Sequence, residues 1–518
     1  MIAFAALTGP LPKAGVVIVA ALAALVLLAR DRRSRALAML GALVLAPTLL
    51  LSDIWNSPQL RLVHHHPLVA LIGALLALAL LGAAAVVIAR HPTWLAPLAI
   101  LALPFRIPIQ SGGTTSNLLV PLYLVVAAGS LAWAVPVLLE SSGRSRPDAV
   151  APRDASGGWA MWVGRLLALY VVLYGIQAIY SPDFEKALQQ MVFFYVPFTL
   201  LYQLLGGVSW TPAVIRRCLV LLVGLALVFS VIGFVEYATK TIILNSKLVV
   251  ANDLHTYFTV NSVFFDPDIF GRFLALVMVL AAVLLLYDRP PREQLAAVAA
   301  LAVLWAGLVL TLSRSSLGAL LVGLAVLAAL RWRPGRALVV AIVVIALGAA
   351  AIAISPTTFG LNQGINGASS GRGGLVSGGI GLFGDRPAWG YGSGSFVKEY
   401  RAHHRATATT LSASHTIPIT IGAEQGLIGL AAYAALVVAA IVCLVRRARG
   451  DPVRSAVAAA FVALVFHTML YADFLEDPVS WALLGIGVAL AVAPARRDAG
   501  ALAPESPQVA SAVAATNS

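Results

Sequence analysis

The sequence predicts an all-α fold, a polytopic transmembrane helix bundle of about 12–15 spans with one large loop outside the cytoplasm. Hydrophobic residues make up 60% of the 518 positions and charged residues only 11%, whereas roughly a quarter of the residues of an average globular protein are charged. The mean hydropathy is +0.91. Repeated apolar runs approach the roughly twenty residues that cross a bilayer core as a helix. These observations together indicate a multi-pass membrane protein.

Each apolar run is a candidate helix, because backbone polar groups in lipid must be satisfied within the segment itself. The run at 92–104 is shorter than the others and suits a re-entrant segment. The runs form two series, one near 13–29, 36–51, 68–89, 92–104, 118–138, 161–180, 188–206 and 213–236, and one near 269–287, 294–312, 315–331, 337–355, 417–445, 453–472 and 479–494.

Basic clusters predict the orientation of these helices. With alternating spans all clusters fall on one side, which the positive-inside rule identifies as the cytoplasm. The first run is followed rather than preceded by its basic cluster, which indicates a retained span and not a cleaved signal peptide. This Lys/Arg excess also explains the net charge of +13 without a nucleic-acid partner. The clusters lie at 30–35, 144–165, 216–217, 289–292, 331–336, 446–454 and 496–497.

The chain is predicted to have three parts. Residues 1–250 form a first set of transmembrane helices, and residues 251–498 form a second set that includes a large outer loop at about 356–416. Long loops are uncommon unless they are functional or disordered, and the mixed Gly, Arg, His and aromatic content of this loop favours function. Residues 499–518, rich in Ala, Pro and Ser, predict a disordered cytoplasmic tail.

Three arginines are predicted to lie on the outer side: Arg272, Arg314 and Arg372. Outer arginines run against the positive-inside tendency and therefore need another explanation. Guanidinium groups bind phosphate oxygens through two parallel hydrogen bonds, so three on one face favour an anion site. In the alternative interpretation each arginine snorkels to the membrane surface or pairs with a carboxylate, such as Asp266, Asp268 or Asp385.

Two further polar residues stand where the large loop enters the next span, namely His415 and Glu424. A neutral histidine can accept the proton of an attacking sugar hydroxyl, because its ordinary pKa lies near the working pH. Alternatively, His415 caps the helix or bonds a backbone carbonyl. Glu424 is expected to orient a substrate or to pair with an arginine, since a carboxylate without a partner in a membrane helix is expensive.

Other signals are weaker or absent. Three adjacent histidines at 64–66 do not share one face in regular structure, so metal binding there is not expected. His467 and Asp473, near the end of a late span, suit a supporting role beside the site. The only two cysteines, Cys218 and Cys443, lie in or beside apolar runs and predict neither a disulfide framework nor a metal site. The sequence contains no nucleotide-binding or dinucleotide fingerprint, so no cofactor and no metal are expected.

Three stretches resemble the O-antigen ligase-like family, which includes O-antigen ligases, O-antigen polymerases and some protein O-oligosaccharyltransferases. The likeness covers roughly residues 260–430. Asp268 stands where the family usually has Asn, and so does Thr416 directly after His415. The stretches are 266–273 (DPDIFGRF), then 311–316 (TLSRSS), and finally the outer loop with Arg372, 387–396 (PAWGYGSGSF) and 415–429 (HTIPITIGAEQGLIG).

The resemblance implies a membrane glycosyltransferase at the outer face of the cytoplasmic (inner) membrane of a bacterium. Its reaction would be metal-independent, inverting transfer or polymerisation of a glycan from a polyprenyl-diphosphate-linked donor onto an acceptor hydroxyl of a glycan or lipid. Arg272, Arg314 and Arg372 would hold the diphosphate and stabilise it as the leaving group, and His415 would activate or orient the acceptor. The resemblance also admits a partner protein that regulates chain length.

Two alternatives come from other classes of protein. A transporter or flippase of lipid-linked saccharides needs ionisable residues at mid-span, whereas the arginines singled out here lie at one face. A non-catalytic scaffold of a cell-envelope complex would have no need for His415 or for the three arginines.

Overall fold

The protein is described by a computed structural model that covers residues 9–55, 64–111, 114–140, 158–243, 252, 258–287, 290–332, 335–336, 339, 372–404, 414, 416–471 and 473–493. Within these ranges, 12 helices are long and apolar enough to cross a membrane, and Pro92–Ala102 and Pro478–Val492 are shorter apolar helices. The predicted class, an all-α multi-pass membrane protein, is confirmed. The run predicted at 337–355 lies outside the described residues except for position 339, and so does the tail at 499–518.

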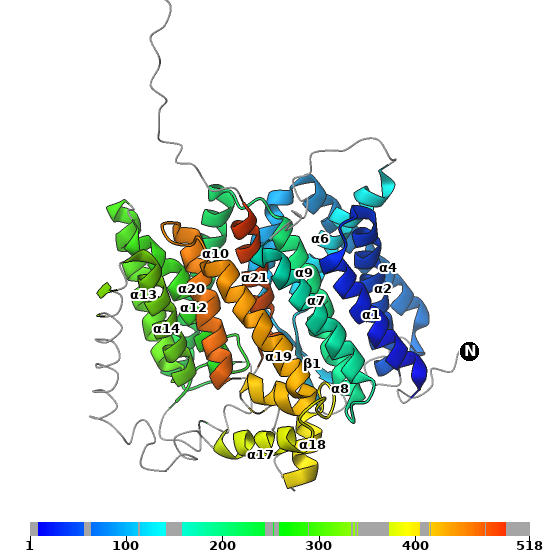
Figure 1. The fold of residues 1–518 in the computed structure, drawn as a ribbon. Helices are drawn as coiled ribbons and strands as arrows, with labels where there is room; N and C mark the ends of the chain where they lie inside the picture. Colours follow the sequence, from blue (N-terminus) through cyan, green and yellow to red (C-terminus); the bar gives the residue numbers. More distant parts are fainter. Residues whose placement is uncertain are drawn as a thin grey trace, which may run out of the picture.

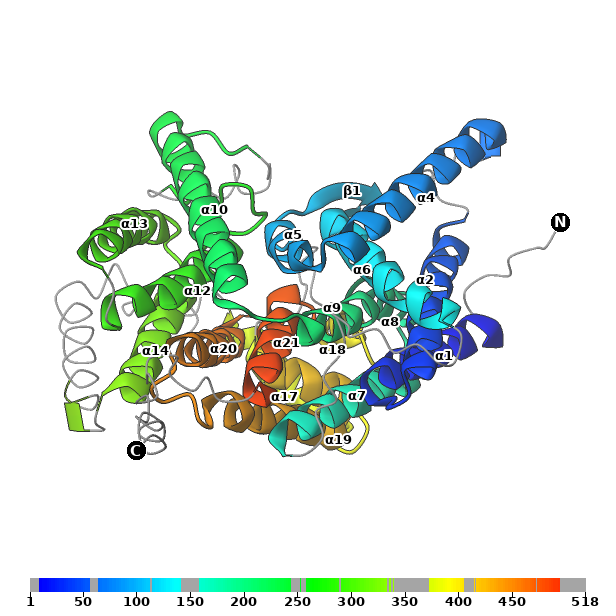
Figure 2. The same cartoon turned by 90° about the horizontal axis from the view of Figure 1, so that it is seen from above.

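The helices before residue 250 follow the predicted runs closely (Figures 1 and 2). They are α1 (Pro10–Leu28), α2 (Arg32–Ile54), α4 (Pro67–Arg90), η2 (Pro92–Trp94), α5 (Leu95–Ala102), α6 (Val120–Leu139), α7 (Trp159–Ala178), α8 (Phe184–Gln190), the π-turn η3 (Met191–Tyr195), α9 (Val196–Gly207) and α10 (Pro212–Thr239). Residues 184–207 together form one candidate span.

The later helices include two that the run pattern did not separate. They are α12 (Pro267–Leu286), α13 (Pro291–Leu310), α14 (Arg314–Arg331), α17 (Arg372–Asp385), α18 (Phe396–His404), α19 (Ile417–Val445), α20 (Pro452–Leu470) and α21 (Pro478–Val492). Helices α17 and α18 belong to the predicted large loop. They lie beyond one end of the bundle, beside α8 (Figure 1). That end is called the α17 end below.

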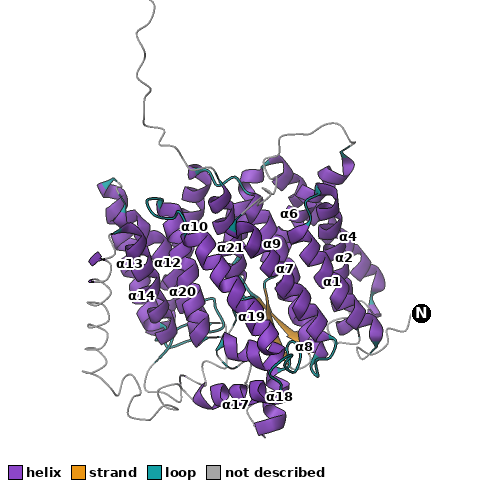
Figure 3. Cartoon of the chain, in the orientation of Figure 1, coloured by secondary structure: helices purple, strands orange, loops and turns teal. Residues whose placement is uncertain are grey.

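The short run near 92–104 forms η2 and α5, which together are too short to cross a core of roughly 30 Å at about 1.5 Å per residue. Two antiparallel strands follow, β1 (Ile107–Ser111) and β2 (Thr114–Leu118), with Ile107 opposite Leu118. Figure 3 shows these strands beside the helices. The segment is therefore a half-length helix joined to a β-hairpin, a detail that the pattern of apolar runs did not predict.

Three helices begin at an Asp-Pro pair, in which the aspartate is the N-cap residue and the proline is the first helical residue. Asp266, Asp451 and Asp477 are the N-cap residues of α12, α20 and α21, and each side chain accepts a backbone N–H of the first turn. An N-cap carboxylate satisfies one of the N–H groups that have no partner inside the helix. Proline at the next position has no N–H to leave unsatisfied. The starts of these three helices are therefore encoded locally.

Helices from both parts of the chain form one continuous apolar core. In this core α7 packs against α1 and α19, and α9 packs against α21. On the other side, α12 packs against α13, α14 and α20. Seen from above, α21 and α9 lie between the early helices and the group formed by α10, α12, α13 and α14 (Figure 2). The starts of α12, α14 and α19, and the loop before α21, are thereby brought to the α17 end.

Candidate functional site

Helix α19 is broken at Gly426, where φ is 66° and ψ is −163°. The glycine-rich loop at 387–396 fills this break with backbone hydrogen bonds. On one side of the break, the N–H of Tyr391 donates to the Ala423 carbonyl over 3.0 Å, and that of Gly392 donates to the Glu424 carbonyl over 2.7 Å. On the other side, the Leu427 N–H donates to the Pro387 carbonyl over 2.7 Å. The loop thus supplies the partners that the interrupted helix lacks.

Two glycines make this close approach possible. A Cβ on Gly390 would lie 2.4 Å from the Glu424 carbonyl oxygen, and one on Gly426 would lie 2.4 Å from the Ala388 carbonyl oxygen. Both residues also have positive φ, at 68° and 66°. Only glycine avoids the clash and tolerates that backbone conformation. Broken backbone at membrane depth is tolerated where protein covers it, and here the loop does so.

The Glu424 side chain points into the same loop. Its two carboxylate oxygens accept the backbone N–H groups of Gly394 over 2.9 Å and of Phe396 over 3.0 Å. The residue is only 9% exposed. The expectation that Glu424 has a partner is therefore confirmed, although the partners are backbone amides of the outer loop and not an arginine. Its role in orienting a substrate stays a prediction.

Arg272 lies one turn into α12 and forms a buried ion pair with Asp477, the N-cap residue of α21. Its Nη2 lies 2.6 Å from Asp477 Oδ2, and both side chains are 4% exposed. Arg272 Nη1 is buried and has no hydrogen-bond partner among the described residues. A carboxylate partner was one of the two interpretations of this arginine, but the carboxylate is none of those suggested.

A polar cluster joins the starts of α12 and α14. Ser313 Oγ donates to Asp268 Oδ1 over 2.5 Å, and Ser315 Oγ donates to the same oxygen over 3.1 Å. His467 Nε2 lies 3.2 Å from the hydroxyl oxygens of Ser315 and Ser316. The two sequence stretches 266–273 and 311–316 are therefore in direct contact. Buried His467 reaches these serines from α20, and its supporting role beside a functional site stays a prediction.

Carboxyl groups surround the loop between α20 and α21. The Tyr471 hydroxyl donates to Asp266 Oδ2 over 3.0 Å, and burial, with the nearby Asp268 carboxylate, raises the pKa of Asp266 to about 6. Burial and the charge of Asp473 raise the pKa of Glu476 to about 8, although Glu476 accepts a hydrogen bond from the Gln190 amide. The protonated form of a carboxyl group is favoured where solvent is excluded.

The structure describes the other predicted site residues only in part. Arg314 is exposed at the first position of α14, directly beside the serines that bind Asp268. Arg372 is the first residue of α17, and its side chain lies outside the described part. His415 also lies outside the described residues, so its predicted role is untested. In the described part of the chain, no group of three or more His, Cys, Asp or Glu residues is arranged to hold a metal ion.

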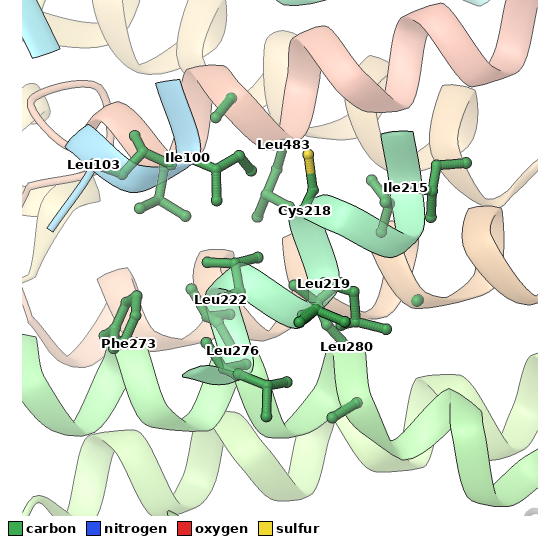
Figure 4. A pocket seen from close by; sticks show the side chains of 18 of the residues that line it. Ile100, Leu103, Ile215, Cys218, Leu219, Leu222, Phe273, Leu276, Leu280 and Leu483 are labelled. Atoms are coloured by element: carbon green, nitrogen blue, oxygen red, sulfur yellow. The ribbon is translucent and has the colours of Figure 1, made fainter. Parts of the chain in front are cut away.

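An apolar cavity of about 760 Å³ extends through the bundle from the Arg272–Asp477 pair. Figure 4 shows part of its lining, where side chains of α5, α10, α12 and α21 face one another. The labelled lining residues there are Ile100, Leu103, Ile215, Cys218, Leu219, Leu222, Phe273, Leu276, Leu280 and Leu483. Arg106 contributes a second guanidinium to the lining, and Arg216 and Glu293 line it where α10 and α13 begin.

The sequence analysis did not single out Asp477 or Arg106. Asp477 has a visible local signal, the Asp-Pro start of α21, but that signal predicts only a helix cap. Arg106 follows the short apolar run in LPFRIP, and an arginine so close to a candidate membrane segment is a functional candidate by default. Neither signal names the cavity that both residues line.

Comparison with known families addresses the second half of the chain. Residues 296–434 match the O-antigen ligase family model. This segment belongs to the O-antigen ligase-like family. The match contains the 311–316 stretch, the 387–396 loop and the part of α19 up to residue 434, with its break at Gly426, whereas 266–273 precedes it. No curated protein matches the chain. The family implies membrane-embedded enzymatic glycosyl transfer that uses lipid-linked glycans.

Proposed function

We propose that the protein is a metal-independent, inverting glycosyltransferase. It would transfer or polymerise a glycan from a polyprenyl-diphosphate-linked donor onto an acceptor hydroxyl. One observation supports the donor class above all: Arg272 stands in the wall of a long apolar cavity, and its buried Nη1 has no hydrogen-bond partner in the described part of the chain. Apolar pockets with a few well-placed polar groups are typical ligand sites. A prenyl chain fits the aliphatic wall, and a diphosphate fits the guanidinium.

The proposed reaction is a single displacement. The acceptor oxygen forms a bond to the anomeric carbon of the donor sugar, and the bond from that carbon to the diphosphate oxygen breaks. The diphosphate leaves with the bonding electron pair, stabilised by Arg272, Arg314 and Arg372. His415 takes the proton of the acceptor hydroxyl. Attack opposite the leaving group inverts the anomeric centre.

The orientation proposed for this chemistry follows from the basic clusters. They favour the non-cytoplasmic side for the α17 end, which in our proposal is the outer face of the cytoplasmic membrane of a bacterium. The donor would then be used at the outer leaflet, with its glycan among α17, α18 and the 387–396 loop. Glu424 would act through this loop, because its carboxylate binds the loop amides. A chain-length regulator would bind the same outer side.

The cavity also separates this proposal from a flippase of lipid-linked saccharides. A flippase must move a polar head group through the membrane and needs polar or ionisable groups at mid-span. Most side chains that line this cavity are Leu, Ile, Val, Phe and Ala, and its charged lining residues are Arg106, Arg216, Arg272, Glu293 and Asp477. Such a wall suits a stationary lipid tail better than a moving sugar.

The experiment is complementation of a deletion strain, with two readouts: the length of the surface glycan and the amount of glycan still attached to its carrier. We expect His415→Ala, expressed at the normal level, to shorten the surface glycan and to leave carrier-linked glycan at the outer leaflet. His65→Ala, at an exposed position, is the matched control. Full complementation by His415→Ala would contradict the assigned proton transfer.

A second variant tests the cavity separately. Leu276→Trp places a large ring in the cavity (Figure 4), and it is expected to prevent donor use while the protein remains folded. Leu75→Trp, at an exposed position of α4, is the control for introducing tryptophan into a span. Normal glycan with Leu276→Trp would mean that the carrier tail binds elsewhere.

A further inference from the structure

We infer that Asp477 is an internal competitor for the anion site: it pairs with Arg272 while the site is empty, and the diphosphate of the carrier must compete with it for the guanidinium. This inference rests on the function proposed above. It adds that the affinity for the donor and for the released prenyl diphosphate is set by a carboxylate of the chain itself. Asp477 would then be a residue that tunes binding and release, and the reacting bonds would not involve it.

The geometry divides the two oxygens of this carboxylate between two tasks. Asp477 Oδ1 accepts the Val479 N–H over 2.8 Å and caps α21. Oδ2 lies 2.6 Å from Arg272 Nη2. The cap fixes the carboxylate to the start of a helix, so it stays beside the guanidinium whether or not a ligand is bound. Both residues line the cavity.

The pair with Asp477 engages only one of the two terminal nitrogens of Arg272. Nη2 faces Asp477, while Nη1 is buried without a hydrogen-bond partner among the described residues. A buried donor without an acceptor is unfavourable, so Nη1 offers a first contact for an incoming phosphate oxygen. A full two-pronged contact uses an N–H of Nη2 as well, so the phosphate must share this nitrogen with Asp477 and lie against its carboxylate.

The charges of Arg272, Asp477 and the diphosphate also indicate that Asp477 opposes binding. In the empty site the pair is neutral overall, which suits an apolar wall. A bound diphosphate places several negative charges beside a carboxylate that cannot move away, and like charges repel strongly where water is excluded. After transfer, the pair can re-form as the prenyl diphosphate leaves. The carboxylate thus weakens binding and promotes product release.

The chain contains a matched control for the capping task. Asp451 precedes Pro452 and Val453 just as Asp477 precedes Pro478 and Val479. Its Oδ1 accepts the N–H groups of Val453 over 2.9 Å and of Arg454 over 3.1 Å. Asparagine caps helices about as well as aspartate. Asp→Asn at either position therefore keeps the cap, and only at 477 does it remove the partner of the buried guanidinium.

The test is binding of farnesyl diphosphate to the purified full-length protein in detergent, measured by titration calorimetry. Asp477→Asn is expected to bind the probe about tenfold more tightly or better, within the usual range of coupling between two sites. Asp451→Asn is expected to bind like the unchanged protein, and Arg272→Gln to bind far more weakly than either.

Asp477→Asn leaves a buried guanidinium without its counter-ion and can lower stability. A thermal-shift series with the same probe covers this case, because a ligand raises the unfolding temperature of the folded state that binds it. We expect a larger probe-induced shift for Asp477→Asn than for the unchanged protein. The double variant Arg272→Gln/Asp477→Asn should regain stability and show no shift.

The outcomes separate the two claims. If Arg272→Gln binds the probe as well as the unchanged protein, the proposed carrier site itself is wrong. If Arg272→Gln loses binding and Asp477→Asn shows neither tighter binding nor a larger shift, the carrier site stands and Asp477 is only a structural counter-ion.

Discussion

Replacing Gly426 by alanine tests whether the outer loop and the broken helix form one unit. The backbone at Gly426, with φ 66° and ψ −163°, lies in a region that is essentially restricted to glycine and costs other residues about 1–3 kcal/mol. The new Cβ would lie 2.4 Å from the Ala388 carbonyl oxygen and 2.5 Å from its carbon. These are backbone atoms, so the loop has to move away.

Moving the 387–396 loop away from α19 also breaks hydrogen bonds, and their loss further lowers the free energy of unfolding. The N–H groups of Leu427 and Ile428 donate to the Pro387 and Ala388 carbonyls. Each N–H left without an acceptor in a span, where water is excluded, costs about 1–3 kcal/mol. Together with the backbone strain, the free energy of unfolding should fall by about 3–9 kcal/mol if the loop detaches. That is a large share of the roughly 5–15 kcal/mol that stabilises a typical protein.

The unfolding temperature can be followed with a thiol-reactive dye, because both cysteines, Cys218 and Cys443, are buried and free. A loss of this size should lower the unfolding temperature by at least ~6 °C, at about 2 °C per kcal/mol. Gly82→Ala in α4 is the control, since its Cβ would meet nothing within 4 Å and alanine suits a helix better than glycine. An unchanged unfolding temperature for Gly426→Ala would refute the proposed coupling of loop and helix.

Three further predictions concern neighbouring contacts. Because burial and Asp473 raise the pKa of Glu476 to about 8, the folded state holds this proton more tightly than the unfolded chain. Protonated Glu476 therefore contributes to the free energy of unfolding at low pH, and this contribution is lost as the pH rises toward 8. Glu476→Gln should flatten that decline in a pH series of unfolding temperatures, and an unchanged slope would contradict the assignment. Gly271→Ala should cost about 1–3 kcal/mol by overpacking, because its Cβ would lie 2.7 Å from Ser316 Oγ; Gly224→Ala, whose Cβ meets nothing within 4 Å, should cost nothing in the same assay. Glu424→Gln should lower stability by about 1.5–3 kcal/mol, the usual value of a hydrogen bond to a charged group, and stability equal to that of the unchanged protein would mean that the amide replaces both bonds.

The sequence alone determined the class of the protein and the positions of most helices. The length of an apolar run and the Asp-Pro pairs before α12, α20 and α21 are local properties, and the bilayer imposes helices on such runs. For the same reason the predicted run at 417–445 has the bounds of α19. The contact between the stretches 266–273 and 311–316 was not predicted from the sequence, because each stretch was read on its own.

Only the tertiary structure decided which groups meet. Arg272 and Asp477 lie on helices far apart in the chain, and each has a sufficient local explanation, as a membrane-edge arginine and as a helix cap. Gly426 is one glycine among several in an apolar run, and its break is stable only because the 387–396 loop bonds both sides of it. Ion pairs, cavities and helix breaks depend on what packs alongside, and helix packing brings these distant segments together. Periodicity and composition describe one segment at a time and therefore could not predict these contacts.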